Sequence, residues 1–281
     1  MKRTLLFILI FTLSQDLLAP PNCELYKQDE LCYQACEEAW TAIRYPQGSH
    51  ESQQHFDCSL ELCPTFAYSY MEKAVPFLKR GLFIEWKKMI DKAVTLAPKE
   101  YLGYRGWCRL QFLRDYQGAI DDIEELKSLV NYDIGFCQTG DYHLEIVRAM
   151  CYKELGQLEK ARAIYTQHLI EDNYDVDLFD YYHWGVLEFE SGKYQKALKH
   201  LDKQIEINDD LAGTYFYKAL CYKELNEYDL YSENLNKAEA YYQKGKVRTD
   251  TYTETLDKVF LIDIQEEIER ASKLIPNEDK G

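Results

Sequence analysis

The chain has 281 residues, 46% of them hydrophobic and 14% aromatic, and its formal net charge at pH 7 is −15. This hydrophobic fraction supports a packed core and excludes wholesale disorder. The negative charge argues against a nucleic-acid partner, because one polyanion repels another, and it favours a basic protein surface instead. Gly (13 residues) and Pro (7) are scarce, which disfavours an all-β fold with its frequent turns.

The start of the chain is typical of a secretory signal peptide. A short basic stretch precedes an apolar run over residues 4–11, which is shorter than the roughly 20 apolar residues that span a bilayer. We expect residues 1–14 to be the signal peptide and residues 15–29 a linker. An uncleaved anchor and a lipoprotein attached at Cys23 are the alternatives. The sequence thus predicts export, to the periplasm or as a secreted protein, with no membrane span in the mature chain.

Four of the nine cysteines cluster near the mature N-terminus. These disulfide candidates are Cys32, Cys36, Cys58 and Cys63. If residues 30–45 and 51–63 form an antiparallel helical hairpin, the two pairs lie at the same end of it. A disulfide across it would stabilise the hairpin by about 3 kcal/mol in the chain-entropy model, and export permits one. The alternatives are reduced cysteines that act as small apolar side chains and a zinc site of four thiolates, although the spacings differ from those of zinc knuckles.

The body of the chain repeats a helical pattern. Segments 106–123, 150–165, 185–201 and 219–231 align with one another, each with a small residue early, a turn, and a second helix. Equivalent second-helix positions fall at Ser52, Trp86, Ala119, Ala161, Ala197 and Tyr231. The steps between them are 34, 33, 42, 36 and 34 residues. The step of 42 places an enlarged connection at residues 131–141.

This pattern resembles the tetratricopeptide repeat (TPR), a helix–turn–helix unit of 34 residues. The resemblance covers about residues 30–245. It implies an all-α fold, a right-handed α-solenoid of about six helix pairs whose small residues allow close helix approach. We expect residues 246–275 to form a C-terminal capping helix and residues 276–281 a flexible tail.

Three isolated cysteines follow the same register. Cys108, Cys151 and Cys221 each lie two residues after the small residue of a first helix. That position calls for a small apolar side chain, so we expect all three in the core.

Motifs that carry chemistry are missing from the sequence. No pair of histidines has the spacing of a helical zinc site, and no glycine-rich nucleotide loop or nucleophile elbow occurs. Residues 172–177 are similar to a calcium loop but lack its glycine and terminal glutamate, so we expect a solvated loop. We therefore expect no cofactor, no metal and no enzymatic activity.

The resemblance implies that the first helices line a concave groove. The groove positions of this chain hold Tyr68, Met71, Trp107, His143, Ile146, Phe179, Tyr182, Phe189 and Phe216, together with Val75, Leu78, Met150, Lys153, Val186, Leu220 and Lys223. Such side chains suit a protein or an extended peptide. The alternative is that many of them pack against neighbouring helices. The clamp that binds C-terminal carboxylates in some TPR proteins needs Lys and Asn where this chain has apolar residues. The sequence thus predicts an exported, non-catalytic scaffold or adaptor, with a thiol–disulfide or metal-binding module at the N-terminal cysteines as the alternative.

Overall fold

The structure is a computed structural model that describes residues 20–171, 174 and 176–274. Within these residues it contains thirteen α-helices and no strand, apart from one isolated bridge between Phe136 and His143. The expected fold class, an all-α solenoid of helix pairs, is therefore confirmed. The expected signal peptide and C-terminal tail lie outside the described residues, as do residues 172, 173 and 175 of the segment that is similar to a calcium loop.

The chain divides into two compact units, and the first ends at Leu96. Its helices pair as α1 with α2 and α3 with α4. The bounds are α1 (Glu30–Ala42), α2 (His50–Leu62), α3 (Ala67–Lys79) and α4 (Phe83–Leu96), preceded by the 3₁₀-helix η1 (Cys23–Tyr26). Side-chain caps set two of the starts, because the Asp29 and Ser49 oxygens accept hydrogen bonds from backbone N–H groups in the first turns of α1 and α2.

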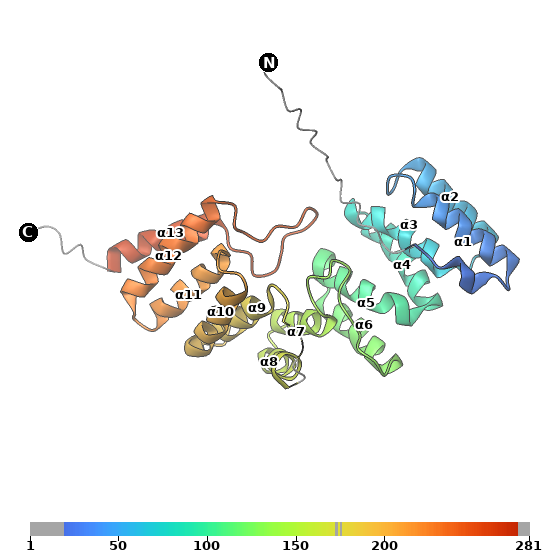
Figure 1. The fold of residues 1–281 in the computed structure, drawn as a ribbon. Helices are drawn as coiled ribbons and strands as arrows, with labels where there is room; N and C mark the ends of the chain where they lie inside the picture. Colours follow the sequence, from blue (N-terminus) through green and yellow to red (C-terminus); the bar gives the residue numbers. More distant parts are fainter. Residues whose placement is uncertain (1–19, 172–173, 175, 275–281) are drawn as a thin grey trace, which may run out of the picture. The chain divides into compact units, whose positions relative to one another are not determined.

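The second unit contains four further helix pairs and a terminal helix (Figure 1). The pairs are α5 (Pro98–Cys108) with α6 (Tyr116–Leu129), α7 (Leu144–Glu154) with α8 (Leu158–Thr166), α9 (Asp180–Glu190) with α10 (Tyr194–Ile207), and α11 (Ala212–Glu224) with α12 (Tyr228–Gln243). The terminal helix is α13 (Leu261–Leu274). Short π-helices, η2 (Arg109–Leu113) and η3 (Gln167–Glu171), extend α5 and α8.

The repeat register has a direct steric basis. All six second-helix positions are at most 2% exposed. A Cβ atom on Gly185 of α9 would lie 2.6 Å from Leu201 of α10, and one on Gly106 of α5 would lie 3.2 Å from Ile123 of α6. A small residue on the first helix therefore makes room for a large one on the second, as the repeat requires. Cys108, Cys151 and Cys221 are fully buried, so their predicted place in the core is confirmed.

Tyr231 stands at a position that usually holds a small residue, and it joins α12 to α13. Its ring is fully buried. Its hydroxyl shares its one proton between two acceptors of Glu267, the carboxylate at 2.5 Å and the backbone carbonyl at 3.0 Å. The larger side chain thus fastens the terminal helix, which covers the last pair.

The expected capping helix over residues 246–275 is too long. Only α13 (Leu261–Leu274) is helical, and the residues between α12 and α13 have no regular secondary structure. The Asp250 carboxylate accepts backbone N–H groups from Tyr252 at 2.7 Å and Thr253 at 2.8 Å. Asp and Thr side chains that bond nearby backbone in this way compete with helix formation, and helical spacing of apolar residues begins only further on.

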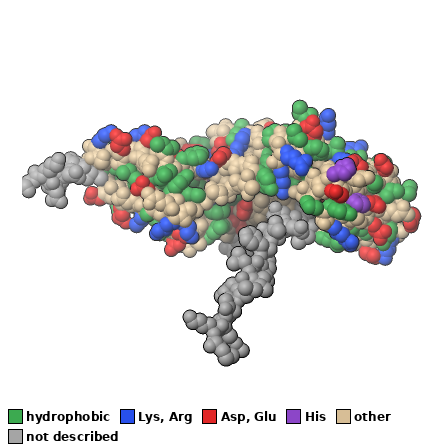
Figure 2. Space-filling model, turned by 90° about the horizontal axis from the view of Figure 1, so that it is seen from above, with side chains coloured by type: hydrophobic (Ala, Val, Ile, Leu, Met, Phe, Trp, Pro, Cys, Tyr) green, Lys and Arg blue, Asp and Glu red, His purple; other side chains and the backbone are tan. Residues whose placement is uncertain are grey.

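Charged side chains of both signs are distributed among hydrophobic ones on the face of the molecule in Figure 2. That face shows no single region of one charge. None of the helices in the described part of the chain is long and apolar enough to cross a membrane.

Candidate functional site

The segment that joins α12 to α13 runs back across the first helices of the second unit (Figure 1). Residues 246–258 are called the strap below. At its start, the backbone carbonyl of Lys246 accepts a hydrogen bond from the backbone N–H of Ala212 at 2.9 Å. The strap therefore begins beside the start of α11, directly after the chain leaves α12.

The far end of the strap is held by residues just after α5. The Gln111 side-chain amide donates to the Thr253 hydroxyl at 2.8 Å. The Arg114 guanidinium donates to the backbone carbonyl of Glu254. These partners are 142 and 140 residues apart in sequence, so the strap connects the first helix pair of the unit with the last.

Asp257 anchors the strap on α7 and α9. Its side chain is only 4% exposed. One carboxylate oxygen forms an ion pair with Lys153 Nζ, and the other accepts from His183 Nδ1 at 2.5 Å. The Tyr182 hydroxyl donates to the backbone carbonyl of the same aspartate. Three donors from two helices thus bind a single residue through its side chain and its main chain.

Arg248 approaches His183 from the other side of the ring. Its guanidinium donates to His183 Nε2 at 2.7 Å and also to the Tyr142 hydroxyl, and it lies 4.5 Å from the Phe179 ring centroid. Because Nε2 accepts this bond, the network assigns the ring proton to Nδ1, from which it is donated to Asp257. A neutral imidazole therefore lies between a cation and an anion of the strap.

The ionisation states follow from burial and from these neighbours. Burial and the Arg248 cation lower the pKa of His183 to about 4. Burial opposes the charge of Asp257, but Lys153 and the His183 hydrogen bond outweigh it and hold its pKa well below the usual value. Burial likewise disfavours the Lys153 ammonium, yet Asp257 and Glu190 raise its pKa above the usual value. At neutral pH the site therefore holds a buried ion pair beside an uncharged histidine.

An open cleft of about 230 Å³ lies beside the strap. Trp107 and Phe179 supply aromatic walls, Val247 and Arg248 come from the strap, and Asp141 comes from the enlarged connection before α7. Apolar walls with a few charged groups suit side chains of a bound polypeptide.

The predicted groove residues fall into three groups. Trp107 and Phe179 line the cleft, whereas Tyr182 and Lys153 contact the strap. The others lie elsewhere: Ile146 is fully buried, Phe216 packs with Val259 and Ile264, Phe189 contacts Tyr194 and Tyr217, and His143 stacks on His168 with ring centroids 4.3 Å apart. In the first unit, Met71 is buried on α3 and Tyr68 is half-buried beside Phe66. The structure therefore brings together Trp107, Lys153, Phe179 and Tyr182.

Sequence reasoning missed the strap and its contacts at His183, Arg248 and Asp257. His183 follows a predicted groove residue directly, but adjacency alone carries no functional signal. Arg248 and Asp257 lay in the expected capping helix. One signal was available: threonine occupies every second position from Thr249 to Thr255. Threonine favours non-helical, extended backbone, so this run argued against a helix over these residues.

The N-terminal cysteines form two disulfides, Cys23–Cys36 and Cys32–Cys63, with Cα–Cα distances of 5.5 and 4.9 Å. Cys32 and Cys63 bridge the start of α1 and the end of α2, as the hairpin predicted. Cys58 is unpaired, and its candidacy was wrong. It precedes Cys63 by five residues, which turns its side chain about 140° around the helix. Cys23 pairs instead, so the expected linker is tied to α1 through η1.

This pairing leaves no set of four free thiolates for the alternative zinc site. In the described ranges, no group of three or more His, Cys, Asp or Glu side chains is placed to hold a metal ion.

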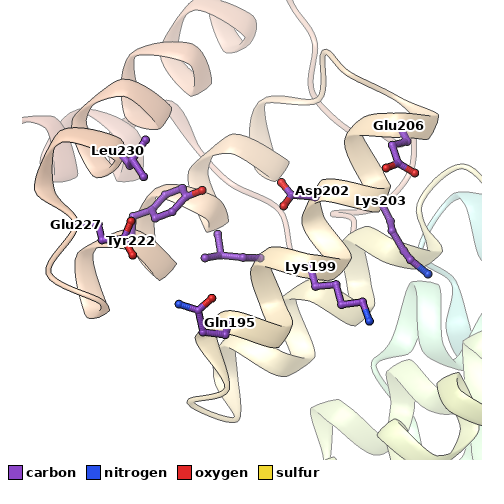
Figure 3. A pocket seen from close by; sticks show the side chains of 9 residues that line it. Gln195, Lys199, Asp202, Lys203, Glu206, Tyr222, Glu227 and Leu230 are labelled. Carbon is purple, nitrogen blue, oxygen red and sulfur yellow. The ribbon is translucent and has the colours of Figure 1, made fainter.

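A second depression lies on the last two helix pairs (Figure 3). Its lining comes from α10, α11 and the start of α12, and α10 presents Lys199, Asp202, Lys203 and Glu206. Asp202 forms an ion pair with Lys218, and Lys203 donates to the Tyr181 hydroxyl at 3.1 Å. Its charged groups are of both signs and partly paired. This surface is therefore suited as a control in binding experiments and is called the reference surface.

No protein-family model and no curated protein matches this sequence. Several solved structures are similar to it. PilW, a widely conserved type IV pilus biogenesis factor, has a TM-score of 0.59 at 14% identity, over 75% of this chain and 94% of PilW. A tetratricopeptide repeat protein from Parabacteroides merdae has a TM-score of 0.53 at 15% identity, over 88% and 87% of the two chains. A chain of the APC/C hetero-tetramer Cut9-Hcn1 has a TM-score of 0.58 at 14% identity. The match covers 89% of the present protein but only 44% of the Cut9-Hcn1 chain. The chain therefore has the fold of tetratricopeptide repeat proteins.

Proposed function

We propose that the protein is an exported, non-catalytic scaffold or adaptor that binds a protein or peptide through the first helices of its second unit. The observation that carries this proposal is the strap. These helices hold a segment of polypeptide without regular secondary structure through the side chains of Lys153, Tyr182 and His183. A face that binds one segment of polypeptide has donors that can bind another.

Export is supported by the two disulfides, because such bonds persist in oxidising compartments. The net charge of −15 adds long-range attraction for a basic partner surface, and this attraction weakens as salt screens it. The disulfides fasten a helix pair, which favours a structural role over the alternative of a thiol–disulfide module.

Position-resolved photocrosslinking tests the proposal. A photoreactive phenylalanine replaces Phe179 in the cleft of one variant and Lys199 on the reference surface of another. We expect a discrete partner from the native envelope or secreted fraction to be captured through position 179 and not through position 199. Equal capture at both positions, or capture at 199 alone, would overturn the assignment to this face.

A further inference from the structure

The contacts of Asp257 define a site for one aspartate residue. Lys153 and His183 bind its carboxylate, while the Tyr182 hydroxyl binds its main-chain carbonyl. In an aspartate, only Cα and one methylene group separate the carboxylate from the main-chain carbonyl. A glutamate would add a second methylene group between them, so the site discriminates by side-chain length as well as charge.

The donors of this site belong to the helical framework. Lys153 lies on α7, and Tyr182 and His183 lie on α9. The side chain of Lys153 is 2% exposed and that of His183 is fully buried while the strap is in place. Glu154 at 2.9 Å and Glu190 at 3.5 Å also form ion pairs with the Lys153 ammonium, but Asp257 is the most buried of its three carboxylate partners and the one that also binds His183. Because burial strengthens the interaction between opposite charges, this face favours an acidic occupant.

The strap itself is suited to exchange. None of its residues is buried as a whole, and the core residue Val259 follows it. Asp257 has a φ of 54°, in the left-handed region, which costs an L-residue roughly 1 kcal/mol. The strap therefore adds little apolar burial of its own and holds its anchor residue in an unfavourable backbone conformation.

We propose that the Lys153–Tyr182–His183 face is a subsite for an aspartate in a segment of a partner protein, and that the strap is an internal occupant which the partner displaces. This inference rests on the proposed function and specifies the chemistry of the partner. The strap contains three basic and three acidic residues, so the partner segment is near neutral and carries one anchoring aspartate. Such a segment avoids the repulsion that a uniformly acidic peptide would meet from a chain of charge −15.

A peptide-binding measurement tests the subsite. In the receptor, residues 246–258 are replaced by a Gly/Ser linker of the same length within the full chain. The probe is a fluorescent peptide with the sequence of the strap. We expect saturable binding, weakened roughly tenfold or more when the peptide carries Asp257→Asn or Asp257→Glu. Lys153→Met in the receptor weakens binding to a similar degree, whereas Lys199→Met leaves it unchanged.

Equal affinity for the aspartate and asparagine peptides would overturn the proposal, as would no saturable binding to a receptor that keeps native helix content and cooperative unfolding. If the linker variant does not fold, the intact chain with Asp257→Asn is the receptor instead. Its weakened strap should then bind the wild-type peptide more tightly than the unaltered chain does, and the absence of that difference would count against displacement.

Two further readouts separate this proposal from its alternatives. Sedimentation of the intact chain without peptide should show a monomer, since a dimer abolished by Asp257→Asn would assign the site to the strap of a second copy. A different result is that the receptor binds the aspartate and asparagine peptides equally while a partner is still captured through position 179. That result would reject the aspartate subsite and retain the proposed function.

Discussion

His183 is the residue whose environment is set most strongly by the strap. Its imidazole accepts from Arg248 on one nitrogen and donates to Asp257 on the other, with Lys153 and Tyr142 also close. A second proton on the ring would place an imidazolium against the Arg248 guanidinium. Attachment of the strap therefore requires the neutral ring.

This requirement predicts that acid releases the strap. The pKa of His183 is about 4 with the strap in place, and we expect release to hydrate the ring and return its pKa towards the value near 6.5 of a free histidine. The released state binds more protons between these values, so attachment weakens as pH falls from about 6.5 towards 4, by up to roughly 3 kcal/mol. Asp257 does not offset the effect, because its lowered pKa keeps it charged in this range.

A nitroxide label at Thr251→Cys, in a Cys58→Ser background, checks this prediction. Thr251 is exposed on the strap, and the EPR line shape reports its mobility. We expect a growing mobile fraction as the pH falls from about 7 to about 4.5, whereas the same label at the exposed Gln195 on α10 should not respond. A strap label that stays equally immobile over this range would contradict the mechanism.

At the scale of the helices, the close approach within each pair depends on a small residue opposite a large one. Gly185 faces Leu201, and Gly106 faces Ile123. This pairing was predictable, because the small and large residues recur at a fixed spacing along the chain. The length of the terminal helix was not, since Asp250 and its neighbours bond their own backbone instead of continuing a helix.

We expect Gly185→Ala to destabilise the second unit. The added Cβ would lie 2.6 Å from Leu201 Cδ2, and overpacking of this kind costs typically 1–3 kcal/mol, more than the small gain in helix propensity returns. Chemical denaturation followed by circular dichroism measures the change, with Gln195→Ala on the exposed face of α10 as the control. A Gly185→Ala variant as stable as the wild-type chain would show that α9 and α10 separate readily.

At the scale of the whole molecule, the covalent and the polar constraints lie in different units. Both disulfides belong to the first unit, and the strap contacts belong to the second. The first unit contains two helix pairs, a small core for which disulfides matter more. The second unit has a larger core and is closed by the strap and α13.

Reduction should therefore loosen the first unit selectively. In the chain-entropy model, loops of 13 and 31 residues are worth roughly 3–4 kcal/mol each. Hydrogen exchange with and without reductant measures this, and protection should fall in α1 and α2 while α9 to α12 keep theirs. Cys58→Ser, which removes a free thiol only, should behave as the wild-type chain. Loss of protection in α9 to α12 on reduction would show that the disulfides do not stabilise the first unit selectively.

The sequence alone determined the helix pairs, their register and the cysteines of the core, because these follow from periodic side-chain volume along neighbouring residues. It also placed Lys153, Phe179 and Tyr182 on one face. Only the tertiary structure decided that residues 246–258 cross that face, that Cys23 replaces Cys58 in a disulfide, and that His183 lies between Arg248 and Asp257. The side-chain contacts of the strap join residues 65 to 142 positions apart through single polar pairs, and the new disulfide joins Cys23 to Cys36 through one covalent bond. Single pairs of this kind leave no period in a sequence from which to predict them.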